Sequence, residues 1–384
     1  MTDLVVFTGD FVLSTALDGS QGTNRARGGV RQITADTDVE AVRMWLAEYV
    51  HSPHTLRSYR KESMRLMAWA TQRLGKPVSS LTREDLLVYE ALLARPPAEW
   101  TDPTLPRRGN AHRLFAGPLS PRSVRQAMGI LSGLFGYWVA AGYIAGNPLA
   151  LRRNRGKNQF QRKAVVERYL DHALWQTVLG FIDTLPQTTL RERQHYERVR
   201  WLFRLLYGTA LRASEAAQVK TSDLVQRRGH WWLRVVGKGD VQGEVPVSDE
   251  LMADLARYRQ FYGFPAHPSP LEETPLVMSI TGRREQFLTP TAIYLVVKEV
   301  FRRAAAVLEP TDPAGAATLR RASTHWLRHT SATHQADAGN NIRNIQKNLR
   351  HASIETTAIY LHAEDDRRHA ETTSIYATIR VKTP

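Results

Sequence analysis

The sequence predicts a two-domain, mainly α-helical protein with one small β-sheet. Apolar residues recur at three- and four-residue spacing over most of the chain, as in helices that pack by one face. One segment, HWWLRVVGKGDVQGEVPV at residues 230–247, instead has the pattern of a strand, a tight turn and a second strand. Residues 151–166 contain six basic residues and no acid, which is typical of an extended linker between domains.

The composition indicates a polyanionic partner. Lys and Arg total 52 against 37 acidic residues, which gives a formal net charge of +15. This excess favours nucleic acid over an anionic membrane, because no apolar run approaches the ~20 residues that a spanning helix needs. The absence of cysteine excludes disulfides, thiolate catalysis and cysteine-bound zinc. We expect a cytoplasmic protein without a signal peptide, since Asp3 and Asp10 flank the apolar run near the N-terminus.

Residues 37–150 are predicted to form a helical bundle. Residues 1–36 before it, with one candidate short strand and a Gly-rich basic stretch, are expected to be a loosely ordered tail. Between the third and fourth helices, residues 95–119 form a long loop rich in proline and glycine. The bundle helices are expected at residues 39–50, 54–75, 82–94 and 120–149, with Trp45, Trp69, Phe135 and Trp138 in the core.

Basic residues of this first domain and the linker are candidates for binding DNA phosphates. For each, a solvated position on a helix face or in a hinge is the alternative. The candidates are Arg57, Arg60, Lys61, Arg122 and Arg125 in the helices, Arg107 and Arg108 in the long loop, and Arg152, Arg153, Arg155 and Lys157 in the linker.

Residues 167–384 are predicted to form a mixed α/β second domain. Its helices are expected at residues 169–185, 192–211, 249–263 and 289–308, and through the segment from His325 to Tyr360. That last segment contains His325, Arg328, His351 and Tyr360, and Arg212 precedes it in GTALRASEAAQV. These residue types suit a phosphodiester, because guanidinium groups bind phosphate oxygens in pairs and a tyrosine hydroxyl can attack phosphorus.

A metal site is the alternative use of the histidines in this segment. His325, His329 and His334 share one predicted helix, but no carboxylate completes an HExxH-type arrangement. We therefore expect no metal, and His329 and His334 are predicted to be packing or hydrogen-bonding residues.

Four sequence boxes resemble those of the tyrosine recombinase (phage integrase) family. They are ALRASE, the hairpin GKGDVQGEVPV, HWLRHTSATH and LRHASIETTAIY, in that order. The likeness is close over the last two thirds of the chain and looser from Asp38 to Leu149. It implies a helical, SAM-like core-binding domain that clamps DNA, followed by a mixed α/β catalytic domain with a C-terminal docking tail.

The resemblance also assigns roles to individual residues. Arg212 and Arg328 bind the scissile phosphate, and Glu215 orients its neighbours; the alternative for Arg212 and Glu215 is a surface ion pair. Lys238, which would otherwise be a solvated turn residue, is the general acid for the leaving 5′-oxygen. His325 assists proton transfer.

The last box contributes His351 and the nucleophile, Tyr360. Their nine-residue interval is that of the family, whereas Tyr360 alone would be taken for a core tyrosine. The family usually has glycine immediately before this histidine, where this chain has Arg350. If this position requires positive φ, an arginine there costs about 1 kcal/mol or more and shifts His351.

The function implied by the resemblance is site-specific DNA recombination through a 3′-phosphotyrosyl intermediate and a Holliday junction, without metal or other cofactor. The partners implied are double-stranded DNA, a homotetramer on two sites, and accessory DNA-bending proteins or a second recombinase. A mobile-element enzyme at the bacterial nucleoid fits this description. The alternatives are a type IB topoisomerase, a hairpin-forming resolvase and a non-catalytic DNA-binding protein on the same scaffold.

Overall fold

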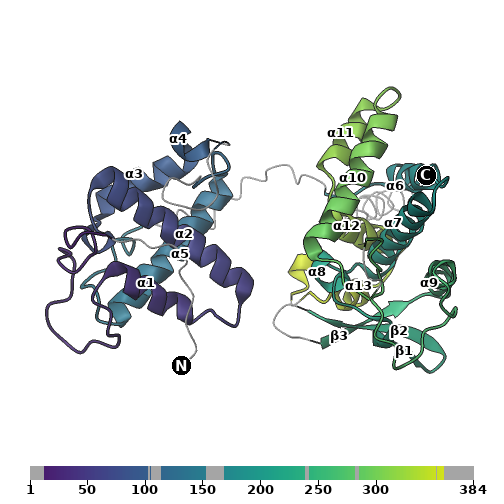
Figure 1. Cartoon of the computed structure of the whole chain (residues 1–384), viewed down its shortest axis with the longest axis horizontal. Helices are drawn as coiled ribbons and strands as arrows, with labels where there is room; N and C mark the ends of the chain where they lie inside the picture. The colour runs from purple at the N-terminus through teal and green to yellow at the C-terminus, as the bar shows by residue number, and fades with distance from the viewer. Residues whose placement is uncertain are drawn as a thin grey trace, which may run out of the picture. The chain divides into compact units, whose positions relative to one another are not determined.

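The computed structural model describes residues 13–102, 104, 114–152, 168–237, 242–281, 285–351 and 353–358. The chain divides into two compact units, Met1–Gln161 and Arg162–Pro384. Each unit has a hydrophobic core of its own. Figure 1 labels the helices and strands of each unit. The predicted fold class is confirmed: the described residues are mainly helical and include one three-stranded sheet. Among them, no helix has the length and apolar character needed to cross a membrane.

The first unit is a bundle of helices around a core rich in aromatic residues. Trp45, Trp69, Phe135 and Trp138 are all buried in it, as predicted. Thr37 and Thr82 each cap a helix with a reciprocal capping box. The elements are α1 (Asp38–Ala47), α2 (Pro53–Trp69) with a π-helical continuation (Ala70–Leu74), a 3₁₀ turn (Val78–Ser80), α3 (Arg83–Ala94), α4 (Ala98–Thr101) and α5 (Pro121–Ala140).

Residues 13–36 differ from the loosely ordered tail that we expected. Arg25 forms a β-bridge with Ile144 and lies over the ring of Tyr143. The Asn24 side chain donates to the carbonyl of Gly146 at 2.7 Å. Asp38, buried at the start of α1, donates its backbone N–H to Asp18. The contacts that order this segment are made with residues distant in the sequence. Composition and local pattern do not reveal such contacts, and they therefore predict a loose tail.

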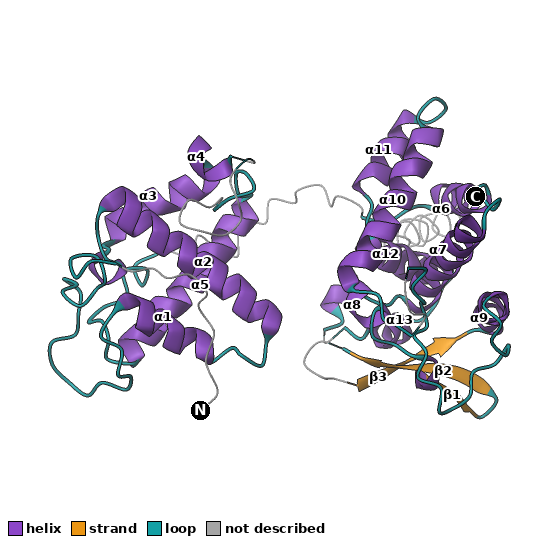
Figure 2. Ribbon diagram, in the orientation of Figure 1, coloured by secondary structure: helices purple, strands orange, loops and turns teal. Residues whose placement is uncertain are grey.

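The second unit is built around α7, whose residues Trp201, Leu202, Phe203 and Leu206 are buried. Figure 2 shows this helix among the others of the unit. Helices α6, α9, α10 and α12 all contact α7. The helices are α6 (His172–Asp183), α7 (Leu190–Thr209), α8 (Ala213–Ala216), a 3₁₀ turn (Thr221–Asp223), α9 (Asp249–Phe261), α10 (Pro290–Leu308), α11 (Pro313–Arg321), α12 (Thr324–Asp337), α13 (Ile342–Leu349) and α14 (Glu355–Ala358).

The sheet has the antiparallel order β1-β2-β3, with β1 (Leu224–Arg227), β2 (His230–Val236) and β3 (Gln242–Val247). The two strands of the predicted hairpin are β2 and β3, and Leu233 pairs with Val245 between them. The sequence analysis missed β1. It joins β2 through Arg228 and Gly229, which both have positive φ, as a tight two-residue hairpin turn requires. An arginine is unusual at such a position, so this turn was not recognised.

Candidate active site

Arg212 stands in the short connection between α7 and α8. Helix α7 ends at Ala210, which adopts the left-handed conformation, and Arg212 is extended at the N-cap of α8. The Arg212 backbone N–H donates to Oε2 of Glu215 at 2.8 Å, and its Nη1 donates to Oε1 at 2.7 Å. The Glu215 side chain is only 3% exposed, whereas that of Arg212 is 36% exposed. Glu215 therefore fixes the direction of a guanidinium that solvent can still reach.

Arg328 lies on α12 and is almost fully buried. Its Nη1 donates to the carbonyl of Ala210 at 2.7 Å, and its Nη2 donates to the carbonyl of Leu349. These carbonyls stand two residues before Arg212 and two residues before His351. Arg328, which is predicted to be a phosphate clamp, therefore connects the segment of Arg212 to the segment of His351 by hydrogen bonds.

The end of α13 positions His351. Arg350 has φ 53° and ψ 44°, so the expectation that this position requires positive φ is confirmed. The Nδ1 of His351 lies 2.9 Å from Oγ1 of the buried Thr357, and its carbonyl accepts from Gln346. This contact orients the imidazole.

The electrostatics of the site keep its histidines neutral at pH 7. Burial lowers the pKa of His351 to about 4, with further contributions from Arg328, Arg212, His325 and Arg350. Burial also lowers the pKa of His325, and the charges of Arg328, Arg212 and Arg168 lower it further. A cluster this positive is suited to an anionic ligand.

Glu215 is the counter-ion of this cluster. Burial raises the pKa of its carboxyl, but Arg350 first and then Arg212 outweigh burial and hold the pKa below its ordinary value. Arg350 Nη2 donates to Glu215 Oε2 at 2.6 Å, so one carboxylate binds two guanidinium groups.

The other histidines of α12 have structural partners. Nδ1 of His334 lies 3.0 Å from Oη of Tyr207, and Nε2 of His334 lies 3.0 Å from the carbonyl oxygen of Leu170. His329 packs edge-on against His325, and burial lowers the pKa of His329 to about 3. In the ranges that the structure describes, no three His, Asp or Glu side chains gather as a metal site.

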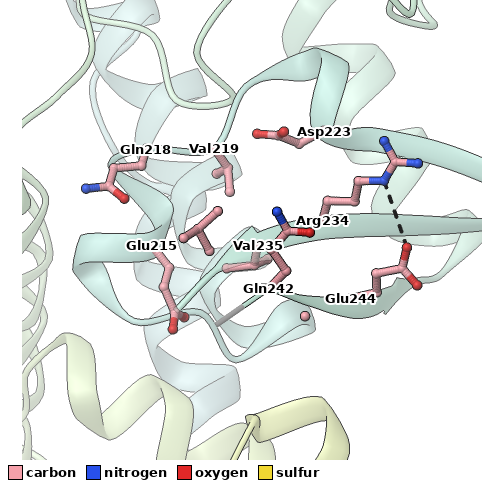
Figure 3. Close-up of a pocket in the computed structure, with 10 residues that line it drawn as sticks. Glu215, Gln218, Val219, Asp223, Arg234, Val235, Gln242 and Glu244 are labelled. Atoms are coloured by element: carbon pink, nitrogen blue, oxygen red, sulfur yellow. Dashed lines mark ion pairs between the residues drawn. The ribbon is translucent and has the colours of Figure 1, made fainter. Parts of the chain in front are cut away.

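A cavity of about 640 Å³ lies between α8 and the β2–β3 hairpin (Figure 3). Glu215 lines one side, and Arg234 and Glu244 lie together on the other. Val236 and Gln242, the ends of the two strands, also line it. The two strand ends that flank residues 238–241 in the sequence therefore lie at the same cavity as Glu215.

Seven predicted site residues lie outside the described residues: Lys238, Tyr360, Arg107, Arg108, Arg153, Arg155 and Lys157. Of the DNA-binding candidates that are described, Arg57, Lys61, Arg122 and Arg125 are exposed and Arg60 is half-buried. Lys61 pairs with Glu62 at 2.9 Å, and Arg152 pairs with Glu90 at 2.8 Å. The sequence analysis missed Arg168, whose charge acts on His325 and His329.

Comparison with known proteins identifies the class. Residues 168–367, more than half of the chain, match the model of the phage integrase family. The chain belongs to this family, so the resemblance to tyrosine recombinases is confirmed.

Individual relatives agree with this assignment. Tyrosine recombinase XerA of Pyrococcus furiosus is 28% identical over 186 residues, which cover 48% of this chain and 54% of that protein. Tyrosine recombinase XerC of Rhodospirillum centenum is 28% identical over 347 residues, covering 88% and 86%. The crystal structure of the XerH site-specific recombinase bound to palindromic difH substrate has a TM-score of 0.56 at 20% identity, covering 84% of this chain and 80% of that one.

Proposed function

We propose that this chain is a site-specific recombinase that cleaves and rejoins DNA, with Tyr360 as the nucleophile. The observation that carries the proposal is the convergence of three boxes on one positive cluster. Arg328 donates hydrogen bonds to two backbone carbonyls of this cluster. One lies two residues before Arg212 and the other two residues before His351. A cluster of this kind stabilises the negative charge that grows on a phosphodiester as it becomes pentacovalent.

Arg212 binds a non-bridging oxygen of the scissile phosphate. Glu215 occupies one edge of its guanidinium, and a guanidinium has five N–H donors, so further donors remain for the phosphate. His351 contributes a further hydrogen bond to the phosphate. Arg328 holds the loops that present both residues, and its charge adds to the field at phosphorus.

The reaction conserves the phosphodiester energy in a protein–DNA bond. Tyr360 Oη attacks phosphorus and gives its proton to His325, the bond to the 5′-oxygen breaks, and Lys238 supplies the proton to that oxygen. His325 assists proton transfer. The freed 5′-hydroxyl of one strand then attacks the phosphotyrosine of its partner strand, so the exchange consumes neither ATP nor a metal-bound water.

A suicide substrate, nicked near the cleavage site, tests the assignment. Wild-type protein should accumulate a covalent adduct, because the short strand diffuses away and religation stops. Tyr360→Phe should bind the same DNA and give no adduct, while the matched control Tyr376→Phe should react normally. An adduct from Tyr360→Phe places the nucleophile elsewhere, and no adduct from wild-type protein on a mapped binding site indicates a non-catalytic DNA-binding protein.

Double-stranded DNA is the proposed partner, and a homotetramer on two sites is the proposed assembly. Residues 364–384 follow the nucleophile and contain four large apolar residues, Ile375, Tyr376, Ile379 and Val381, too few for a separate core. We infer that this tail docks on a neighbouring subunit. Truncation after Asp366 should leave binding to a single site intact and abolish the four-subunit complex, as measured by light scattering. A truncated protein that still assembles on two sites would contradict docking between subunits.

A further inference from the structure

Arg350 occupies a position where an arginine is conformationally costly. Its φ of 53° lies in the left-handed region, which glycine adopts freely and a residue with Cβ adopts at a cost of about 1 kcal/mol. The side chain is nevertheless mostly removed from solvent, with 12% exposed. An arginine that is both strained and buried needs a compensating interaction.

The ion pair with Glu215 is that interaction. Arg350 Nη2 lies 2.6 Å from Oε2 of Glu215, across 135 residues of sequence. The same carboxylate accepts from the backbone N–H and from Nη1 of Arg212. Two guanidinium groups on one carboxylate leave a net positive charge, whereas Arg212 and Glu215 alone would be neutral. Arg350 therefore keeps Arg212 in place and restores the charge that Glu215 cancels.

The methylene chain of Arg350 also meets the hairpin. A Cβ added at Gly243 would lie 2.8 Å from Cδ and 3.2 Å from Cγ of Arg350, so this part of β3 accommodates the side chain only because it is a glycine. Gly243 stands two residues after the 238–241 turn. Arg350 thus contacts the first box and the hairpin, and it immediately precedes His351.

We propose that Arg350 is a positioning residue for cleavage, which holds Arg212 through Glu215 and fixes β3 beside it. The inference rests on the proposed function, in which Arg212 binds the scissile phosphate. It concerns this chain specifically, because a glycine at this position could make neither contact.

Single-turnover cleavage of a suicide substrate tests the proposal. Arg350→Gln should slow adduct formation by about tenfold to a hundredfold, the scale of a misplaced catalytic group, with little change in DNA affinity. Arg350→Lys should recover part of the rate because it keeps the charge. The loss should shrink on a substrate with a neutral methylphosphonate at the scissile position, where a positive charge has less to stabilise. A purely structural role would slow both substrates equally.

Two matched variants complete the experiment. Arg228→Gly removes another arginine of positive φ, from an exposed turn, and should leave the rate unchanged. Gly243→Ala should slow cleavage in the wild-type chain by displacing the Arg350 side chain, and should have no further effect in an Arg350→Gly background. This pair keeps the proposal testable if Arg350→Gln folds poorly.

The outcomes separate the two levels of the argument. If Arg212→Ala abolishes cleavage while Arg350→Gln reacts at the wild-type rate, or loses the same factor on both substrates, the positioning role is refuted and the proposed function stands. Equal slowing by Gly243→Ala in both backgrounds refutes it as well. If Arg212→Ala still cleaves at the wild-type rate, Arg212 does not bind the scissile phosphate, and the part of the proposed function on which this inference rests fails.

Discussion

Asp38 should make the first unit less stable as the pH rises, opposite to the usual behaviour of a carboxylate. Its side chain is 1% exposed and accepts from the Ser79 backbone at 2.9 Å and from Tyr143 Oη at 2.8 Å. Burial raises its pKa to about 6, although those hydrogen bonds and the charge of Arg25 act in the other direction. The folded state therefore keeps a proton that the unfolded chain releases near pH 3.8.

The magnitude follows from linkage. A pKa raised from 3.8 to about 6 corresponds to about 3 kcal/mol of stability that is present below pH 3.8 and lost as the pH rises through 6. The N-terminus of α1 favours the ionised carboxylate by ~0.3–1 kcal/mol, which leaves about 2 kcal/mol. Asp38→Asn resembles the protonated acid at every pH. We expect the variant to match wild type at pH 4 and to be more stable by about 2 kcal/mol at pH 7.5.

Native-state hydrogen exchange followed by mass spectrometry measures this stability difference, because it reports on α1 and residues 13–36 separately from the second unit. Asp36→Asn is the matched control, since the Asp36 side chain is 80% exposed. This control should change the exchange of α1 and residues 13–36 little. The reasoning is wrong if the stability difference between Asp38→Asn and wild type is the same at pH 4 and pH 7.5. It is also wrong if the variant becomes less stable than wild type as the pH rises.

Three further predictions concern the catalytic unit and the linker. Lys238→Ala should slow cleavage of an ordinary substrate far more than of one with a 5′-bridging sulfur, whose leaving group needs no proton; equal losses would remove Lys238 as the acid. His351 should remain neutral from about pH 5.5 to 8 by NMR, with its pKa rising from about 4 when DNA binds, because phosphate offsets the nearby arginines; an unchanged pKa would place His351 away from the phosphate. Neutralising Arg152, Arg153 and Arg155 should weaken binding to all sequences and flatten the slope of log K against log salt by about 3, at roughly 0.9 per phosphate contact; an unchanged slope would make the linker a solvated hinge.

Local sequence determined the helices and the hairpin strands, because their signals are short in range. Apolar periodicity placed α2, α5 and α7, and the capping residue Thr82 placed the start of α3. The boxes around Arg212, Arg328 and His351 likewise identified the family, since each box preserves residue types at fixed local spacing.

Contacts between distant segments were decided only by the tertiary structure. The carbonyls of Ala210 and Leu349 are 139 residues apart, and only the packing of α7, α12 and α13 brings both to Arg328. The strand β1 depended on an arginine in a left-handed turn, and the order in residues 13–36 depended on contacts with Asp38, Ile144 and Gly146. Arg350 illustrates both contributions. The family's glycine at this position indicates a positive φ, but the partner of the arginine, Glu215, could be found only from the tertiary structure.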